Sequence, residues 1–419
     1  MNDQTKQYDV VILGGGPAGL AAAIEAHKAG AEVLLIEREK KLGGILKQCI
    51  HDGFGLVHFK QRLTGPEYAE RFLEEFYATG IGYMVNTFAN EVRKLKEGGF
   101  ELVLQSMQGI IFINTKTIVL ACGCRERTSR QVFIHGDRPA GIFSAGTAQY
   151  MVNIMGLMPT KRCVILGSGD IGMIMARRLT LEGASVEGVY EIKDTPAGLA
   201  RNVSQCLEDF NIPLHLSTTV TRVIGSKRVE AVEVCKVNEK FELIEDSKRI
   251  VACDALILSV GLMPENEIAE SLGVDMDPAT KGPYVDQTLM TSVAGVFSCG
   301  NALHVNDLVD YVSQSGFVAG RAAANYKPGT RSLVKIDYDC KDFLYAVPQY
   351  YDKAKGGALT LYFRTREDSR KKRVSVLVNS EKVLAKKYNR LLPSEMQALS
   401  FEPKQAVTDE ITLSLEDYS

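Results

Sequence analysis

The chain has 419 residues, more than one hydrophobic core usually holds, so two or three packed domains are expected. Its 49 basic and 51 acidic residues leave a formal charge of -2, which excludes a general electrostatic attraction to nucleic acid or to an anionic membrane. The polar N-terminus lacks a signal sequence, and no apolar stretch approaches the roughly 20 residues of a bilayer span. We therefore expect a cytoplasmic protein without a transmembrane segment. The nine cysteines, scattered and odd in number, are unlike a secreted disulfide framework.

The first unit, Val10–Glu37, is an apolar strand, a glycine-rich turn, a helix of small residues and a second strand that ends in an acid. In the spacing Gly14-x-Gly16-x-x-Gly19, the first glycine permits a tight turn, the second lets backbone approach a pyrophosphate, and the third lets helix and sheet lie close. Glu37 is placed to accept hydrogen bonds from both ribose hydroxyls of an adenosine. The unit predicts a bound dinucleotide. Further candidates for this site are Pro17, Ala18, Arg38 and Gly44.

A second unit, Cys163–Glu191, repeats the pattern with Gly167, Gly169 and Gly172. Glu191 at the strand end would repel a 2′-phosphate, and no arginine pair follows it, so NAD(H) is favoured over NADP(H). The acid falls one residue later than in the first unit, and the alternative is that it merely faces solvent. Asp170 and Ile171 complete this candidate site.

Short β-branched segments follow each unit, at Glu101–Cys122 and Thr218–Val260, so the fold class is α/β, with two Rossmann-like domains that carry β-meander insertions. The last part of the chain contains no glycine fingerprint. Its strand-like segments are Ala358–Phe363, Val374–Val378 and Ile411–Leu415, which predict a small, mostly β domain. The basic run Arg364–Arg373 is expected to be a solvated hairpin loop rather than a nucleic-acid site.

The order of the two units resembles the pyridine-nucleotide:flavoprotein oxidoreductases that include glutathione reductase and thioredoxin reductase, whose first unit binds FAD and whose second binds NAD(P)H. The segment Leu256–Asn266, with Gly261, looks like the family's return into the FAD domain. Gly295–Asn301 looks like its second FAD motif and adds Gly300 and Asn301 as candidates. Asn301 stands where the family has an aspartate, and its amide can still bond the ribityl chain. A helix over 307–326 is implied to point its N-terminus at the flavin pyrimidine.

Four segments suggest a closer resemblance, to the flavoprotein subunits of bacterial amino-acid and opine dehydrogenases and of anaerobic-type glycerol-3-phosphate dehydrogenase complexes. They are Leu42–Gly55, Cys122–Arg127 with Gly123, Arg138–Gly146 and Cys299–His304. Amino-acid relatives carry an iron–sulfur cysteine cluster near the C-terminus, whereas Arg331–Ser419 contains only Cys340. The resemblance therefore implies that electrons pass through a partner dehydrogenase or a small electron-carrier subunit.

The implied domains are an FAD domain of residues 1–135 and 255–330, an NAD(H) domain of residues 136–254, and a β-rich domain of residues 331–419. The last would serve a homodimer contact or partner docking. The implied activity is that of an FAD-dependent NAD(H):acceptor oxidoreductase, an enzyme that passes hydride between nicotinamide and flavin with electrons flowing in either direction.

Neither dithiol pattern of the disulfide reductases is present, so a disulfide substrate is not expected. Cys49 is a candidate catalytic thiol of an NADH peroxidase or oxidase, or else a packed helix residue. His51 is a candidate proton donor, since an imidazole pKa near 6.5 suits neutral pH, or else a structural histidine.

Cys122 and Cys124 are expected to be structural thiols, and no metal site is expected. His304 and Asp307 are expected to cap the following helix and line the flavin. A third functional class also stays open, a redox-sensing protein that binds FAD and NAD without significant turnover.

Overall fold

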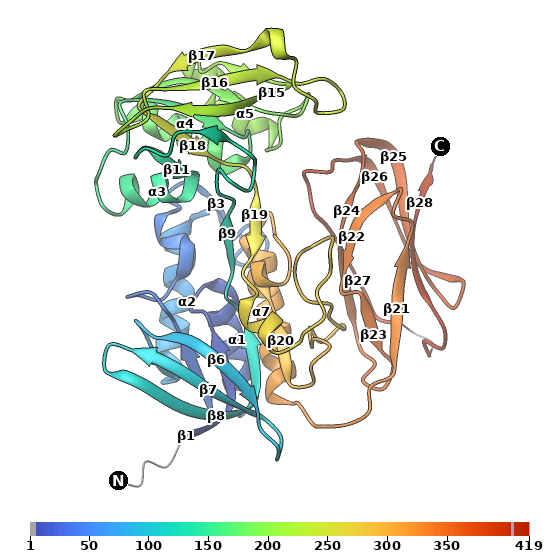
Figure 1. Ribbon diagram of the computed structural model, residues 1–419. Helices are drawn as coiled ribbons and strands as arrows, with labels where there is room; N and C mark the ends of the chain where they lie inside the picture. Colours follow the sequence, from blue (N-terminus) through green and yellow to red (C-terminus); the bar gives the residue numbers. More distant parts are fainter. Residues whose placement is uncertain (1–5, 404–405, 419) are drawn as a thin grey trace. The chain divides into compact units, whose positions relative to one another are not determined.

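The structure is a computed structural model that describes residues 6–403 and 406–418. The chain divides into two compact units: unit 1 joins Met1–Cys124 to Pro264–Ser419, and unit 2 is Arg125–Met263 (Figure 1). The chain passes from one unit to the other at two places, and a short strand lies at each. These strands, β9 (Cys124–Glu126) and β19 (Leu262–Pro264), form a two-stranded sheet. Within the described ranges, no helix combines the length and the apolar character that a membrane span requires.

The main sheet of unit 1 is built around β1, because its residues Val10–Leu13 are apolar and buried on both faces. β1 pairs in parallel with β2 and β8, and β5 and β20 extend this parallel part, while β7 and β6 follow β8 as an antiparallel meander. The strands are β1 (Lys6–Leu13), β2 (Val33–Ile36), β5 (Gly82–Met84), β6 (Phe88–Lys94), β7 (Phe100–Ser106), β8 (Gly109–Leu120) and β20 (Val296–Ser298). The predicted α/β class with a meander insertion is confirmed.

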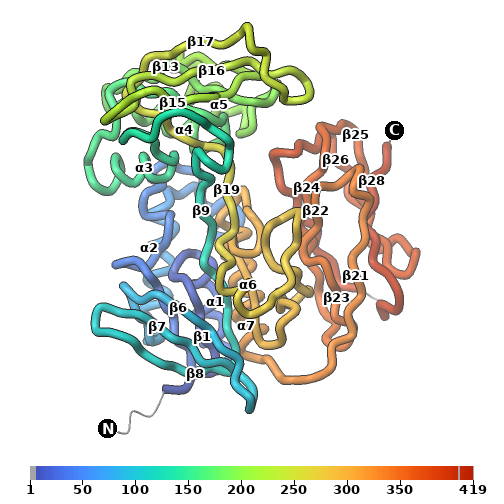
Figure 2. Tube along the Cα trace, viewed as in Figure 1, coloured from blue at the N-terminus to red at the C-terminus, as the bar shows by residue number. Residues whose placement is uncertain are grey.

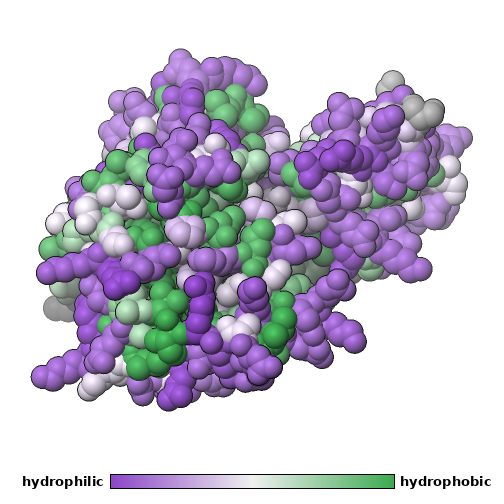
Figure 3. Space-filling view, turned by 90° about the horizontal axis from the view of Figure 1, so that it is seen from above, coloured by the Kyte–Doolittle hydropathy of each residue, from purple (hydrophilic) through white to green (hydrophobic). Residues whose placement is uncertain are grey.

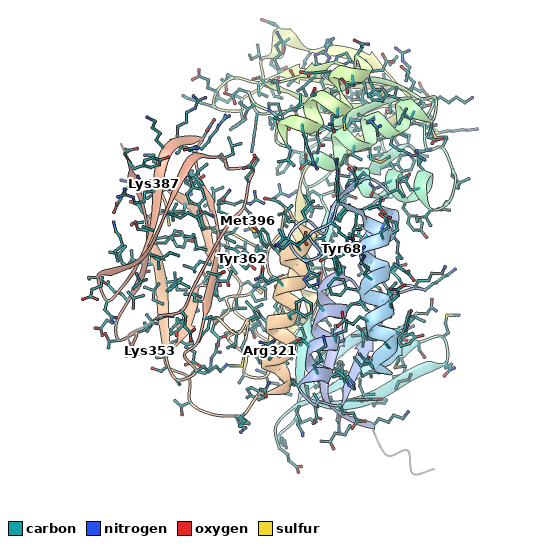
Figure 4. The ribbon with its side chains drawn as sticks, turned by 180° about the vertical axis from the view of Figure 1, so that it is seen from behind. Tyr68, Arg321, Lys353, Tyr362, Lys387 and Met396 are labelled. Carbon is teal, nitrogen blue, oxygen red and sulfur yellow. The ribbon has the colours of Figure 1, made fainter. Side chains whose placement is uncertain are left out.

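Helices α1 (Pro17–Lys28) and α7 (Val309–Ala324) lie against each other beside this sheet (Figure 1). Their backbones approach so closely that a Cβ atom on Gly320 would lie 2.1 Å from the carbonyl oxygen of Ala22. At the edge of the contact, Arg321 Nε donates to Glu25 Oε1 over 2.8 Å (Figure 4). The small residues of α1 therefore allow the two helices to pack at close range.

Helix α2 (Gly65–Thr79) has the start and stop signals of a stable helix. Thr64 and Glu67 form a reciprocal capping box, and Gly80 ends the helix in the left-handed conformation. Its buried Tyr68 hydroxyl donates to Ser313 Oγ of α7 over 2.9 Å. The shorter elements of this part are η1 (Gly44–Gln48), β3 (Asp52–Phe54), β4 (Leu63–Thr64), α6 (Glu267–Ser271) and η4 (Gly300–Ala302).

Unit 2 holds a five-stranded parallel sheet in the order β11-β18-β12-β13-β14 and a four-stranded sheet in the order β10-β15-β16-β17. The strands are β10 (His135–Gly136), β11 (Ile142–Ser144), β12 (Arg162–Leu166), β13 (Ser185–Tyr190), β14 (Leu214–His215), β15 (Thr218–Ile224), β16 (Ala231–Lys236), β17 (Arg249–Ala252) and β18 (Ala255–Leu258). The helices are α3 (Ala145–Asn153), α4 (Asp170–Leu181), α5 (Ala200–Cys206), η2 (Glu208–Phe210) and η3 (Glu245–Ser247). The parallel sheet repeats the strand–turn–helix arrangement that begins unit 1.

The C-terminal domain is β-rich, as predicted, and consists of two sheets (Figure 2). One sheet contains β21 (Leu333–Tyr338), β23 (Tyr350–Asp352), β25 (Ser369–Val378), β26 (Glu381–Leu391) and β28 (Ile411–Asp417). The other contains β22 (Phe343–Val347), β24 (Leu359–Thr365) and β27 (Gln397–Phe401). Alternate side chains of both sheets form its core, including Val374, Val376, Phe343 and Phe363. The C-terminal domain lies at the right of Figure 3, as it does in Figure 1, and the face seen there is mainly hydrophilic.

The prediction of a loop for the basic run Arg364–Arg373 is wrong. Strand β24 continues through Thr365 and β25 already begins at Ser369, so only the short connection between them is a turn. Lys372 of the run pairs with Asp417 of β28, and Asp368, an acid within the run, pairs with Arg390 of β26. Cross-strand ion pairs of this kind allow a basic segment to join a sheet.

Substitution of Gly320 by alanine tests the α1–α7 contact. The new methyl group meets a backbone oxygen, so we expect a loss of about 1–3 kcal/mol of stability, less the ~1 kcal/mol that alanine gains in helix propensity. Urea unfolding followed by circular dichroism measures the change. Gly329→Ala is the matched control, because nothing lies within 4 Å of its Cβ position. Equal midpoints for the two variants would contradict the packing argument.

Candidate functional site

The first glycine turn is held by the carboxylate at the end of β2. Glu37 is buried, and its Oε2 accepts from the Gly15 amide over 2.7 Å while its Oε1 accepts from the Glu39 amide over 2.8 Å. Gly14 has φ +111°, and a Cβ there would lie 2.3 Å from the Ala121 carbonyl oxygen. Only glycine fits this position. Each carboxylate oxygen has a second lone pair with which it can accept from a ribose hydroxyl.

The second glycine turn repeats this arrangement. Glu191 is buried, Oε2 accepts from the Ser168 amide over 2.9 Å, and Oε1 accepts from the Lys193 amide over 3.1 Å. Gly167 has φ +97°, and its Cβ would lie 2.1 Å from the Ser259 carbonyl oxygen. The carboxylate therefore faces the turn, which argues against the solvent-facing alternative.

A β-bulge explains why Glu191 falls one residue later in its unit than Glu37. In the parallel pair β12–β13, Cys163 faces Val186 but Val164 faces Gly188, so β13 contains one extra residue. Beyond the bulge the register matches the first unit: the residue before the first glycine, Leu13 or Leu166, pairs with the residue before the acid.

Both turns end at a helix start that suits a phosphate group. The N-cap residues Gly16 of α1 and Gly169 of α4 supply no side-chain cap, so the first-turn amides have no side-chain acceptor at the cap. The first turn of α1 contains no acid. The residues of unit 1 therefore fit a dinucleotide pyrophosphate at α1.

The first turn of α4 differs because it contains Asp170. Its Oδ1 accepts from the Leu199 amide over 2.9 Å and from Asn202 Nδ2 over 2.6 Å. The Ser168 hydroxyl donates to Glu191 and accepts from the Ala197 amide over 2.9 Å. Ser168 and Asp170 thus fasten the segment 197–202 onto the second turn. Sequence reasoning missed this role of Ser168.

The segment Gly295–Asn301, which the sequence predicts to be a second flavin motif, lies beside the first helix start. A Cβ on Gly300 would lie 2.8 Å from Ala18 Cβ, and the Gly300 amide donates to Ser315 Oγ over 2.8 Å. Asn301 Oδ1 accepts from Asn306 twice, from its backbone amide over 3.0 Å and from its Nδ2 over 3.3 Å. Asn301 Nδ2 donates to Cys124 Sγ over 3.5 Å. Asn306, which the motif does not include, therefore fixes the orientation of the Asn301 amide.

Other predicted residues surround the first turn. A Cβ on Gly44 would lie 2.9 Å from Gly16 Cα, so these two backbones are in close approach. Arg38 forms a two-point ion pair with Glu265, with distances of 2.7 and 3.0 Å. This pair joins the end of β2 to the chain that returns from unit 2.

The two candidate catalytic residues lie just after η1. Burial raises the pKa of the Cys49 thiol to about 12, so it is protonated at neutral pH. Cys49 Sγ donates to the Ile45 carbonyl over 3.4 Å, and the His51 ring lies 5.1 Å from the Phe54 ring. The raised pKa disfavours a thiolate function for Cys49. The roles of Cys49 and His51 stay predictions.

None of the nine cysteines, all of which lie in the described part of the chain, forms a disulfide. Burial, followed by the charge of Glu265, raises the pKa of Cys122 to about 12, and its Sγ donates to the Leu13 carbonyl over 3.7 Å. Gly123 separates Cys122 from Cys124 with φ +78°. Among the residues that the structure describes, no three His, Cys, Asp or Glu side chains gather as a metal site would require.

The expectation that His304 and Asp307 cap the following helix is wrong. The N-cap residue of α7 is Leu308, and no side chain caps the helix. Asp307 instead pairs with Arg364 of β24. His304 is fully buried between aromatic rings of the C-terminal domain. Both side chains therefore contact a domain that sequence reasoning treated as separate.

With one exception, the residues predicted for the first turn and those predicted for the second belong to different units: Gly261, expected in the FAD domain of residues 255–330, lies in unit 2. Unit 1 contains Gly14, Gly16, Pro17, Ala18, Gly19, Glu37, Arg38, Gly44, Cys49, His51, Gly123, Gly300 and Asn301. Unit 2 contains Gly167, Gly169, Asp170, Ile171, Gly172, Glu191 and Gly261.

Comparison with known proteins gives one family. The family model described as pyridine nucleotide-disulphide oxidoreductase matches residues 8–316. One of the subunits of opine oxidase from Agrobacterium tumefaciens is 22% identical over 77% of this chain and 65% of its own length, so the chain spans about two thirds of that relative. Hydrogen cyanide synthase subunit HcnB of Pseudomonas protegens is 26% identical over 75% of this chain and 69% of its own length.

Two further similarities cover almost the whole of the other protein. The 34.2 kDa protein in the rubredoxin operon of Clostridium pasteurianum is 25% identical over 78% of this chain and 99% of its own length. The crystal structure of T. acidophilum thioredoxin reductase matches with a TM-score of 0.61 and 21% identity, over 76% of this chain and 98% of that one. At this identity the second similarity concerns the fold.

Alkylation tests the protonation of Cys49. Because burial raises the pKa of the Cys49 thiol to about 12, almost none of it is thiolate at pH 7.5, so iodoacetamide should modify exposed Cys340 long before Cys49. The rate at Cys49 should rise as the pH increases toward 12. Peptide mass spectrometry over time measures both sites, with Cys340→Ser as control. Equal rates at pH 7.5 would contradict the raised pKa.

Proposed function

The chain belongs to the pyridine nucleotide-disulphide oxidoreductase family, an FAD- and pyridine nucleotide-dependent family of oxidoreductases, and from that premise we propose that it is an FAD-dependent NAD(H):acceptor oxidoreductase. One observation carries the proposal: each of the two glycine turns is closed by a buried carboxylate that accepts from the amide inside the turn. Two dinucleotide sites in one chain suit electron exchange between two dinucleotides.

The first site would hold FAD. The amides at the start of α1 would bind its pyrophosphate, Glu37 would accept from its adenosine ribose, and Asn301 would bond its ribityl chain. Bound FAD supplies the hydride-accepting chemistry, and the protein supplies binding and orientation. The close approaches of Gly16 to Gly44 and of Ala18 to Gly300 leave backbone rather than side chains at this site.

The second site would hold NAD(H) in preference to NADP(H). Both oxygens of Glu191 are bound to backbone amides, so the charge is fixed where a 2′-phosphate would lie. Repulsion between the carboxylate and that phosphate disfavours NADP(H).

The proposed electron partner is a dehydrogenase or an electron-carrier subunit. Two of the similar proteins are named as subunits, one of an opine oxidase and one of a hydrogen cyanide synthase, which supports a multi-component system. A glycerol-3-phosphate or amino-acid dehydrogenase is the partner class that the sequence motifs favour. The peroxidase alternative receives no support from Cys49, whose thiol is protonated at neutral pH.

Anaerobic stopped-flow reduction tests the proposed function. We expect NADH to bleach the flavin faster than NADPH, and a viologen dye, but not peroxide, to reoxidise it. Rapid reoxidation by peroxide would restore the peroxidase alternative, and reduction too slow for turnover would favour a redox-sensing protein. A purified chain that binds no FAD would overturn the proposal.

Glu191→Gln tests the nucleotide preference, because it removes the charge and keeps the shape. We expect the preference for NADH over NADPH in flavin reduction to fall roughly tenfold, which corresponds to ~1.4 kcal/mol of lost repulsion. Glu37→Gln is the matched control from the first turn: it should lower FAD retention without changing the preference. A preference that is unaltered in Glu191→Gln would show that the carboxylate does not face the ribose.

A further inference from the structure

The C-terminal domain lies beyond residue 316, where the family match ends, yet buried polar contacts join it to the flavin core. Gln349 Nε2 donates to Asp277 Oδ2 over 2.7 Å, and Gln287 exchanges two hydrogen bonds with the backbone of Asp352, at 2.7 and 3.0 Å. These four side chains are all less than 9% exposed. Buried directional contacts of this kind fix how the domain is seated.

Arg364 is at the centre of a second group of contacts between the domain and the core. Its Nε donates to the Tyr345 hydroxyl over 2.9 Å, one Nη donates to the Pro393 carbonyl over 3.2 Å, and the other pairs with Asp307. The second oxygen of Asp307 accepts from the Met396 amide over 2.6 Å. Both oxygens of Asp307 therefore have partners from the C-terminal domain.

These contacts continue into the second flavin motif. Asp307 directly follows Asn306, whose two donors hold Asn301 Oδ1, and Asn306 Nδ2 also donates to the His304 carbonyl over 2.8 Å. The same segment begins at Gly300, which lies against Ala18 at the start of α1. The connection from Arg364 to the Asn301 amide thus consists of the ion pair with Asp307, the peptide link from Asp307 to Asn306, and the hydrogen bonds from Asn306 to Asn301.

Aromatic side chains of β22 and β24 enclose the same segment. The ring of His304 lies 6.0 Å from the ring of Tyr345 and 5.5 Å from that of Tyr362, and His304 Nδ1 is buried without a hydrogen-bond partner. The Tyr362 hydroxyl donates to Gln314 Oε1 of α7 over 3.3 Å. Figure 4 shows Tyr362 and Met396 on the side of the domain that faces α7. Burial, together with the charge of Arg364, lowers the pKa of His304 to about 3, so the imidazole is neutral.

We propose that Arg364 of the C-terminal domain is a positioning residue for the second flavin motif: it holds Asp307 and thereby the Asn306–Asn301 contact, and it neutralises the Asp307 carboxylate beside the flavin site. This role deepens the proposed function and rests on FAD binding in unit 1. It assigns the C-terminal domain to the flavin site of its own chain. Homodimer contact or partner docking, the roles expected from the sequence, are not needed to explain these contacts.

Arg364→Gln is the first test, on the full chain. Loss of the ion pair should speed FAD dissociation several-fold, because Asn301 loses its fixed orientation. It should also shift the flavin midpoint potential to more negative values, because an unneutralised Asp307 carboxylate opposes the added electrons. Arg390→Gln, which breaks the exposed pair with Asp368 in the same domain, is the matched control and should change neither quantity.

Two further variants separate charge from packing. Arg364→Lys keeps the charge but loses the planar fork, so the potential should stay near that of the native chain while FAD dissociates faster. In Asp307→Asn combined with Arg364→Gln no charge is left unpaired, so the potential should return toward the native value. A potential in Arg364→Gln equal to that of Arg390→Gln, with equal FAD retention, would overturn the positioning role.

A measurement on the native chain covers the case in which Arg364→Gln does not fold. Hydrogen exchange with and without FAD should show added protection in residues 301–308 and 359–365 together, and none in the β25–β26 hairpin. Protection confined to 301–308 would overturn the inference. A native chain that binds no FAD contradicts the proposed function itself, whereas FAD binding with no response to Arg364 contradicts only this inference.

Discussion

Both predicted dinucleotide sites depend on one kind of contact. In each glycine turn, an amide donates a hydrogen bond to the carboxylate at the end of the next strand. A buried carboxylate is costly unless its oxygens are bonded, and charge-assisted bonds to amides contribute about 1.5–3 kcal/mol each. Glu37 and Glu191 therefore fix the turn, the strand end and the direction of the helix together. The bulge in β13 shows how strict the requirement is, because an extra residue is absorbed before the acid is reached.

The two turns differ at the positions between the motif glycines, where the motif does not require a particular residue type. The first turn has Gly15 and Pro17 where the second turn has Ser168 and Asp170, so neither position offers a polar side chain to the following loop. The contact there is a backbone bond, in which the Gly43 amide donates to the Gly15 carbonyl over 2.8 Å. The second turn keeps the corresponding backbone bond, from Gly198 to Ser168, and adds the side-chain contacts of Ser168 and Asp170. Asp170 also places a negative charge where pyrophosphate would bind, which weakens attraction at α4 relative to α1. That difference suits a permanently bound FAD at the first turn and an exchanging nucleotide at the second.

The sequence predicted those parts of the molecule that follow local rules. Both glycine units, the helix after Asn301 and three strands of the C-terminal domain, β24, β25 and β28, follow from spacing, periodicity and β-branched composition. It could not predict contacts between distant residues, such as Asp307 with Arg364 or Gln349 with Asp277. The basic run was misread because Asp417, the partner of Lys372, lies on a strand that only the fold brings alongside. Asp307 was misread for the same reason, since an acid just before a helix is locally a good cap.

The C-terminal domain contacts the flavin motif through polar groups, and such contacts restrict how far the domain can shift. An apolar interface tolerates small shifts, whereas Asp307, with both oxygens bonded to the domain, does not. The bonds of Arg364 to Tyr345 and Pro393 within the domain fix the guanidinium that Asp307 meets. The buried Nδ1 of the neutral His304 has no hydrogen-bond partner, and the rings of Tyr345 and Tyr362 pack against the imidazole. Because the hydrophobic core around α1 and α7 also includes Tyr345 and Val347, a displaced domain would expose apolar surface and break the polar contacts at once. The domain is thus held at one position relative to Asn301, as the orientation of a cofactor requires.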